Sequence, residues 1–89
     1  MFMQTATIQN EQGFHVRPAQ LVASASGQYA AAVRIKTEDG RTADARSMLD
    51  LMTLGLEKGM TVLVEAEGDG EKEVVTALCQ LIESKFGEA

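Results

Sequence analysis

Residues 13–18 bring a histidine, an arginine and a proline together where a helix is expected to begin. His15 is the only histidine of the chain and Pro18 is its only proline. A proline at the first helical position loses no hydrogen bond, because an N–H at that position has no partner within the helix. With Pro18 as the first helical residue, Arg17 is the predicted N-cap and His15 lies just ahead of the helix.

A helix start of this kind is suited to binding an anion. The first-turn N–H groups, which we assign to Ala19 and Gln20, would point toward the space beside the imidazole, and Arg17 would add a cation. An imidazole nitrogen beside such a cradle is the arrangement of a histidine that accepts a phosphoryl group. We therefore predict phosphate binding by Arg17, Ala19 and Gln20. A lone histidine without a function is the alternative that these residues leave open.

Residues 46–56 form a second segment of interest. Ser47 and Asp50 fit a capping box with Asp in place of the usual Glu, so Ser47 is predicted to cap a short helix. Such a helix buries only one face on a sheet, and Leu51 and Leu54 are the predicted core residues. The other apolar residues considered are Met48, Leu49 and Met52. They are predicted to form an exposed apolar patch, which is typical of a partner site, unless they too belong to the core.

The periodicity of apolar residues predicts the elements that position these groups. Alternation predicts strands at residues 3–8, 33–37, 41–45 and 61–67. Helical spacing predicts helices at residues 18–27, 47–54 and 71–86. Strands that are apolar on one side only suit a sheet buried on one face. The predicted fold is α+β, an open-faced β-sandwich of order βαββαβα whose four-stranded antiparallel sheet is covered on one face by three helices.

Composition narrows the class of protein. A chain of 89 residues suits one small domain, residues 1–89. A single cysteine cannot form a disulfide framework, and one histidine with one cysteine cannot complete a zinc site. No metal or cofactor is therefore expected. Cys79 is interpreted as a side chain that fills the core. No stretch is apolar enough to span a membrane, and the N-terminus lacks the features of a signal peptide. These features predict a reduced, cytoplasmic protein.

Charge is distributed unevenly along the chain. There are 13 acidic and 8 basic residues, a net charge of −5, but no acid occurs between residues 12 and 37. Asp44 and the acidic residues at positions 65–73 are interpreted as solvated surface and helix-start acids. Because basic clusters and interleaved aromatic residues are missing, nucleic acid is a poor partner and a nucleic-acid-binding sheet module is disfavoured.

Three segments together resemble one known family. Residues 13–19, GFHVRPA, resemble the G-[hydrophobic]-H-x-R-P-A motif of the histidine-containing phosphocarrier proteins, the HPr family of the bacterial phosphoenolpyruvate:sugar phosphotransferase system. Residues 46–55, RSMLDLMTLG, resemble the family's second segment. Residues 64–68, VEAEG, resemble the end of its last strand. The resemblance covers essentially the whole chain and implies the same fold.

The resemblance implies a phosphoryl carrier rather than an enzyme. It implies that His15 accepts a phosphoryl group on Nδ1 from phosphorylated enzyme I and passes it to a sugar-specific enzyme IIA. We expect a monomer without membrane insertion. The resemblance also implies regulatory phosphorylation of Ser47 by HPr kinase/phosphorylase. Asp50 departs from the Lys or Gly of many relatives and would repel a phosphate on Ser47. The implied partner-binding residues are Val16, Gln20, Met48, Leu49 and Met52.

Two other functions remain open on the sequence. A nitrogen-branch or other regulatory paralogue would carry the same His15 and report metabolic state instead of feeding sugar import. A small α+β phosphate-cleaving enzyme of the acylphosphatase type would need a residue that positions water, commonly Asn. Asn10 is the only asparagine and precedes the predicted anion site by a turn.

Overall fold

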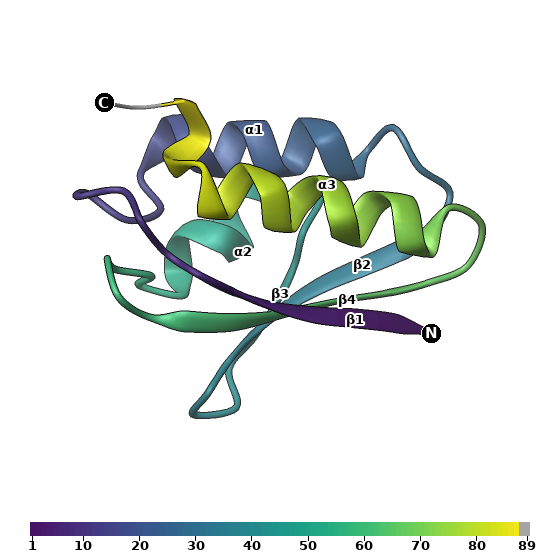
Figure 1. Ribbon diagram of the computed structural model, residues 1–89, viewed down its shortest axis with the longest axis horizontal. Helices are drawn as coiled ribbons and strands as arrows, with labels where there is room; N and C mark the ends of the chain where they lie inside the picture. The colour runs from purple at the N-terminus through teal and green to yellow at the C-terminus, as the bar shows by residue number, and fades with distance from the viewer. Residues whose placement is uncertain (88–89) are drawn as a thin grey trace.

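The computed structural model describes residues 1–87, so the last two residues of the predicted domain lie outside it. Four strands and three α-helices follow one another in the predicted order, and a short 3-10 turn comes last (Figure 1). The elements are β1 (Phe2–Thr7), α1 (Val16–Ser26), β2 (Ala32–Thr37), β3 (Thr42–Asp44), α2 (Met48–Thr53), β4 (Thr61–Glu67), α3 (Glu71–Glu83) and the turn η1 (Lys85–Gly87). Within residues 1–87, no helix is long and apolar enough to cross a membrane.

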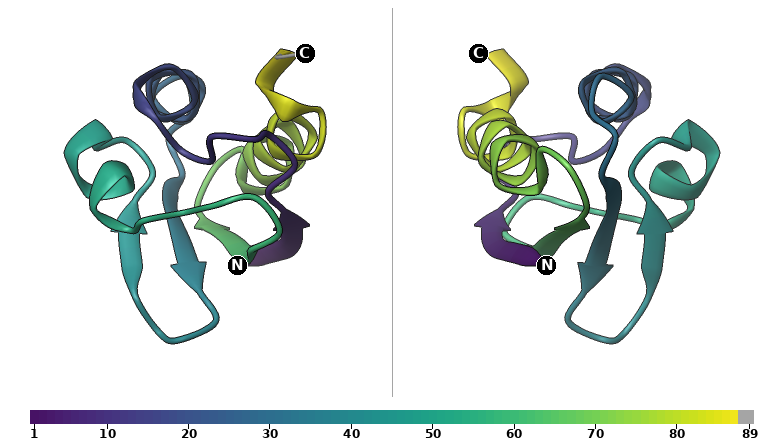
Figure 2. Two further views of the ribbon diagram at one scale, coloured as in Figure 1. Left: turned by 90° about the vertical axis from the view of Figure 1, so that its left-hand side faces the viewer. Right: turned by 90° about the vertical axis from the view of Figure 1, so that its right-hand side faces the viewer.

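The strands form one antiparallel sheet in the order β1-β4-β2-β3. The central strand β4 pairs with β1 on one side, where Leu63 lies opposite Thr5. On its other side β4 pairs with β2, where Val64 lies opposite Ile35. The helices all lie on one side of the sheet, and its other face is uncovered (Figure 2). The predicted open-faced α+β sandwich is therefore confirmed.

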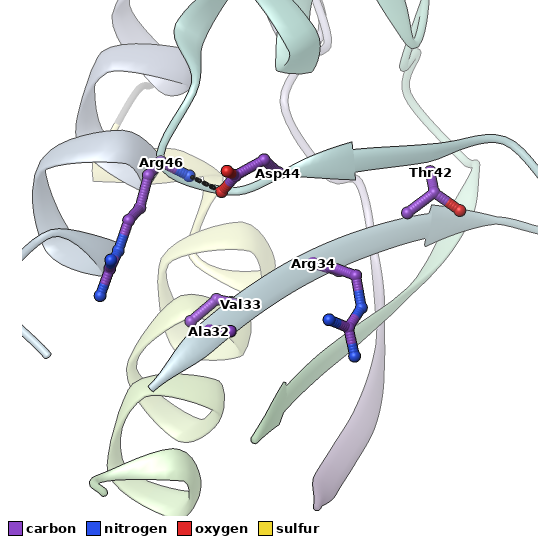
Figure 3. Close-up of a pocket in the computed structure, with 6 residues that line it drawn as sticks. All are labelled: Ala32, Val33, Arg34, Thr42, Asp44 and Arg46. Carbon is purple, nitrogen blue, oxygen red and sulfur yellow. Dashed lines mark hydrogen bonds between the residues drawn. The ribbon is translucent and has the colours of Figure 1, made fainter. Parts of the chain in front are cut away.

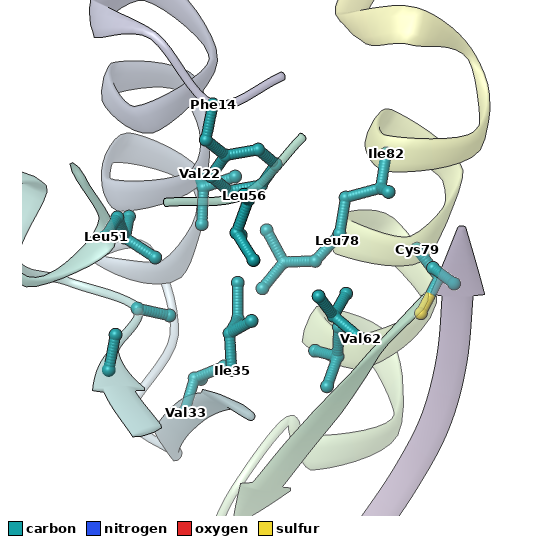
Figure 4. Close-up of a cluster of buried hydrophobic side chains, with 14 of the residues drawn as sticks. Phe14, Val22, Val33, Ile35, Leu51, Leu56, Val62, Leu78, Cys79 and Ile82 are labelled. Carbon is teal, nitrogen blue, oxygen red and sulfur yellow. The ribbon is translucent and has the colours of Figure 1, made fainter. Parts of the chain in front are cut away.

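The core lies between the sheet and the helices (Figure 4). Alternate residues of β4, such as Val62 and Val64, face the helices and are fully buried. Leu51 and Leu54 are buried, which confirms them as core residues. Cys79 is buried as well, and this burial raises the pKa of its thiol to about 11. The thiol is therefore a core side chain with little thiolate at neutral pH.

Helix α3 ends at Glu83, three residues before the predicted end. Lys85 and Phe86 adopt the left-handed region, with φ of 61° and 54°, and this conformation cannot continue an α-helix. The turn brings the Phe86 ring back into the core, where only 2% of the residue is exposed. There it packs edge to face on Phe14, with ring centroids 5.2 Å apart. Burial of the aromatic ring thus accounts for the early helix end.

Glu65 is the one acidic residue for which the solvated-surface interpretation is wrong, since only 3% of it is exposed. It lies on the uncovered face of the sheet, opposite Met3 on β1 and Arg34 on β2. Its Oε1 accepts from Arg34 Nε at 2.8 Å and lies 3.1 Å from Lys36 Nζ. The hydrogen bond from Arg34, assisted by Lys36, holds the pKa of the Glu65 carboxyl below its usual value.

We expect the Glu65 ion pairs to make stability depend on pH in acid. Because the pKa of this carboxyl is lower in the folded protein than its ordinary 4.5, the stabilisation is present above that pH. It is lost as the pH falls through the folded-state pKa. Glu65→Gln should lower the melting temperature at neutral pH by about 5 °C and flatten its decline in acid.

Thermal unfolding followed by circular dichroism over a pH series measures this effect. Glu73→Gln, on an exposed residue of α3, makes the same change in net charge and serves as the control. An acid decline in Glu65→Gln as steep as that of the parent would contradict the assignment.

Candidate functional site

Helix α1 begins at Val16, and its N-cap is His15 rather than Arg17. The backbone of His15 is extended, with φ −86° and ψ −166°, and its carbonyl accepts from the Ala19 N–H at 3.1 Å. Pro18 is therefore the third helical residue. A proline is tolerated anywhere in the first turn, because the N–H groups there precede the first intrahelical bond. The prediction that the helix begins at Pro18 is wrong for this reason.

The earlier start changes which amides face an anion. Ala19 and Gln20 do not supply the unbonded first-turn amides, because the Ala19 N–H is bound to the His15 carbonyl and Gln20 lies deeper in the helix; phosphate binding by these residues stays a prediction. The two N–H groups that precede the first intrahelical bond belong to Val16 and Arg17. A phosphoryl group beside the His15 ring would therefore meet these two amides at the positive end of the helix dipole.

The loop between β1 and α1 fixes the position of His15. Gly13 has a φ of 61°, and a Cβ there would lie 2.0 Å from the Leu56 carbonyl oxygen, so only glycine fits. The Phe14 N–H donates to the same oxygen at 3.1 Å, and the Phe14 ring is buried. His15 itself is partly exposed. His15 therefore lies at the surface, between the buried Phe14 and the first turn of α1.

The C-terminal turn reaches the same site from α3. Arg17 Nη1 donates to the carbonyl oxygen of Phe86 at 3.4 Å, while the Phe86 ring packs on Phe14. Residues on both sides of His15 thus contact this turn. A straight helix over the predicted residues 71–86 would not bring Phe86 to this contact, so the sequence pattern does not indicate it.

Exposed apolar side chains gather beside the site on α1 and α2, which pack against each other. The exposed fractions are 54% for Val16, 75% for Leu49 and 43% for Met52, while Met48 is partly buried and Gln20 is exposed. We call these five residues the docking patch. Their exposure agrees with the prediction except at Met48, and their role in binding partners stays a prediction.

Ser47 caps helix α2, as predicted, but the predicted capping box is only half formed, because the Ser47 N–H donates to the Asp44 carbonyl and not to the Asp50 carboxylate. The Oγ of Ser47 accepts from the Asp50 N–H at 3.2 Å. The carboxylate of Asp50 accepts from the Asp44 N–H at 3.4 Å, and that of Asp44 accepts from the Arg46 N–H at 2.9 Å. Two carboxylates therefore lie next to the Ser47 cap.

A hollow of about 280 Å³ lies away from His15, over β2 and β3 (Figure 3). Its two arginine side chains extend in different directions. Arg34 is bound to Glu65, and Arg46 donates to the carbonyl oxygens of Tyr29 and Ala31. These guanidinium groups do not converge, so the hollow is not assigned to a ligand.

Comparison with known proteins identifies the family of this chain. The family model described as PTS HPr component phosphorylation site matches residues 2–84. The phosphocarrier protein HPr of Cupriavidus necator is 34% identical over 88 residues, which cover 99% of this chain and 98% of that protein. The phosphocarrier protein NPr of Escherichia coli (strain K12) is 35% identical over 85 residues, covering 96% of this chain and 94% of that protein.

Solved structures show the same relationship. HPr-C-His from Thermoanaerobacter tengcongensis superposes with a TM-score of 0.93 at 37% identity, covering 100% of this chain and 99% of that one. An HPr dimer from the same organism gives a TM-score of 0.77 at 39% identity, covering 99% of this chain and 100% of that one. With its histidine at the start of α1 and a family match over nearly its whole length, the chain belongs to the HPr family of phosphocarrier proteins of the phosphotransferase system.

Proposed function

We propose that this protein accepts a phosphoryl group on Nδ1 of His15 from phosphorylated enzyme I and passes it to a histidine of a sugar-specific enzyme IIA. One observation carries the proposal: in this chain of the HPr family, His15 is partly exposed and lies at the N-cap of α1. The amides of Val16 and Arg17 and the Arg17 guanidinium supply positive charge beside the ring.

The transfer needs little chemistry from the protein beyond positioning. The lone pair of Nδ1 attacks phosphorus as the bond to the donor breaks, and the electron pair of that bond leaves with the donor. The resulting P–N bond keeps the phosphoryl-transfer potential high. In the second transfer, the histidine of enzyme IIA attacks phosphorus, and the P–N bond to His15 breaks with its electron pair returning to Nδ1. Arg17 and the first-turn amides stabilise the oxygens of the group in transit, which is the main protein contribution to such transfers.

The docking patch is the proposed contact surface for both partners. It lies next to the reacting ring, because Val16 directly follows His15. Methionine side chains adapt to differently shaped partners, and exposed apolar groups of this kind mark interaction sites. We also propose that residues 1–89 act as a single domain and as a monomer. Light scattering at assay concentration tests the oligomeric state.

Incubation with phosphoenolpyruvate and enzyme I, followed by intact mass spectrometry, tests the proposed transfer. The expected result is the addition of one phosphoryl group, which is lost again when an enzyme IIA domain is added. The HPr of Cupriavidus necator is the positive control. Failure of this protein to be labelled under conditions that label the control would contradict the proposal.

A nitrogen-branch carrier is the second candidate, because the NPr of Escherichia coli is as similar to this chain as the HPr of Cupriavidus necator, at 35% and 34% identity. Initial rates with the sugar-branch and nitrogen-branch forms of enzyme I distinguish the two functions. An acylphosphatase-type reaction is disfavoured, because Asn10 is buried and its side-chain amide is bound to a backbone carbonyl.

Ser47 is the proposed site of regulatory phosphorylation by HPr kinase/phosphorylase. A phosphate on its Oγ would disturb the cap of α2 and would face the carboxylates of Asp44 and Asp50. Because α2 carries Leu49 and Met52, such a change would alter the docking patch.

Ser47→Asp should raise the KM for transfer from enzyme I about tenfold with a smaller effect on kcat, because the new charge lies beside the docking patch. Aspartate also caps helices well, so the free energy of unfolding should fall by no more than about 0.5 kcal/mol. Ser47→Ala should do the reverse, losing about 1 kcal/mol of stability and keeping the parent kinetics.

Transfer kinetics and thermal unfolding of both variants check these results. Gln28→Glu adds one negative charge at an exposed position just past the far end of α1 and serves as the control. If Ser47→Asp keeps the KM of the parent, Ser47 is only a cap and the regulatory role is wrong.

A further inference from the structure

We infer that Asn10 is a positioning residue for phosphoryl transfer, because its side-chain amide holds the turn that presents His15. The inference rests on the proposed function of His15 and adds a residue to it. Asn10 lies in the loop between β1 and α1, five positions before the histidine, and only 1% of it is exposed.

Two consecutive turns connect Asn10 to His15. The Gly13 N–H donates to the Asn10 carbonyl at 3.1 Å and closes the first turn. The His15 N–H donates to the Gly13 carbonyl at 3.2 Å and closes the second. The side-chain nitrogen of Asn10 donates to this same Gly13 carbonyl at 2.5 Å. One oxygen therefore accepts from both the Asn10 amide and the backbone of His15.

The second turn does not hold His15 by itself. A hydrogen bond between residues two apart closes a three-residue γ-turn, here of the inverse kind because Phe14 does not have a positive φ, and this turn contributes a single bent hydrogen bond. The Asn10 amide fixes the direction of the accepting oxygen. Contact of Gly13 with the Leu56 carbonyl limits the loop on its other side. Without the amide, the Gly13 carbonyl could turn toward water, and the N-cap backbone of His15 would turn with it.

The burial of Asn10 also indicates a geometric role. Its Oδ1 has no hydrogen-bond partner within the described residues, although the side chain is buried. A buried carbonyl oxygen without a partner is unfavourable, so an asparagine is a costly residue for filling this space. Asn10 contributes one specific group to the site, its side-chain N–H, which donates to the Gly13 carbonyl oxygen. Displacement of a reacting group by about 1 Å can slow a reaction 100-fold, which makes such a donor valuable.

Asn10→Ala removes the donor and tests the inference. At a temperature where circular dichroism shows every variant folded, kcat for transfer from enzyme I should fall about tenfold and KM should change less than about twofold. Hydrogen exchange of the His15 N–H should become about tenfold faster. Asn10→Ser, with a donor on a shorter side chain, should fall between the parent and Asn10→Ala in both measurements.

Two controls separate positioning from stability. Ser26→Ala removes the other buried side chain whose oxygen has no partner in the described chain, at the far end of α1. Val75→Ala destabilises the core from the N-terminal half of α3. Both should keep the kcat of the parent and its exchange at His15.

The outcomes distinguish this inference from the proposed function. Parent kcat in Asn10→Ala, or an equal loss of kcat in Val75→Ala, would overturn the positioning role, as would unchanged exchange of the His15 N–H. If the parent itself accepts no phosphoryl group, the proposed function fails. In that case, faster exchange of the His15 N–H in Asn10→Ala still supports the claim that the Asn10 amide fixes the backbone of His15, and unchanged exchange overturns that claim.

Discussion

His15→Ala should abolish acceptance of a phosphoryl group from enzyme I while leaving the fold intact. The ring is the proposed acceptor, and no other histidine exists in the chain to replace it. Its side chain makes no capping hydrogen bond to α1 and is partly exposed, so its removal takes little from the core. Intact mass spectrometry after incubation with phosphoenolpyruvate and enzyme I measures the first effect, and thermal unfolding measures the second.

Gln12→Ala is the matched control for this experiment, because Gln12 is exposed in the same loop and should be labelled like the parent. The label on the parent should be lost in acid and kept in alkali, the behaviour of a phosphohistidine and not of a phosphoserine. Labelling of His15→Ala at another residue would overturn the assignment of the acceptor.

Arg17→Ala should slow phosphoryl transfer about 10- to 100-fold. A charge-assisted hydrogen bond to the group in transit contributes about 1.5–3 kcal/mol, which corresponds to this change in rate. The Arg17 side chain is exposed on the first turn of α1, and its hydrogen bond to the Phe86 carbonyl is long, at 3.4 Å. The loss of stability should therefore stay below about 1 kcal/mol. Transfer kinetics in both directions, together with thermal unfolding, check the prediction.

Two further variants identify what Arg17 contributes. Lys72→Ala removes one exposed positive charge from the first turn of α3 and should transfer at the parent rate. Arg17→Lys keeps the charge but loses the planar pair of donors, so an intermediate rate is expected. Parent rates in Arg17→Ala would show that the helix amides are sufficient and that the guanidinium plays no part.

Local patterns predicted most of the fold. Strand β4 occupies the predicted residues 61–67, because apolar residues at every second position, Val62, Val64 and Ala66, are typical of a strand that packs one face on the core. The start of α1 was missed by two residues, since proline is equally acceptable at several positions of a first turn. The end of α3 was missed because Lys85 and Phe86 are not residue types that signal a left-handed turn.

The site was only partly predictable for a similar reason. His15 and Ser47 lie in short motifs, so their place at helix starts follows from neighbours in the sequence. The contact of Phe86 with Phe14 joins residues 72 positions apart, and the pairing of Glu65 with Arg34 joins two strands. Such contacts depend on the packed structure, and no local pattern indicates them. Only one feature could have indicated that Glu65 is buried: it lies on the central strand, next to the basic residues Arg34 and Lys36 of β2.

A heteronuclear NMR spectrum of the histidine ring after phosphorylation by enzyme I identifies the nitrogen that accepts the phosphoryl group. We expect phosphorus to be bonded to Nδ1 of His15, and the backbone amides of Val16 and Arg17 to shift more than that of Ala19, which is already bound to the His15 carbonyl. Phosphorylation at Nε2 or at another residue, or first-turn amides that do not respond, would contradict this prediction.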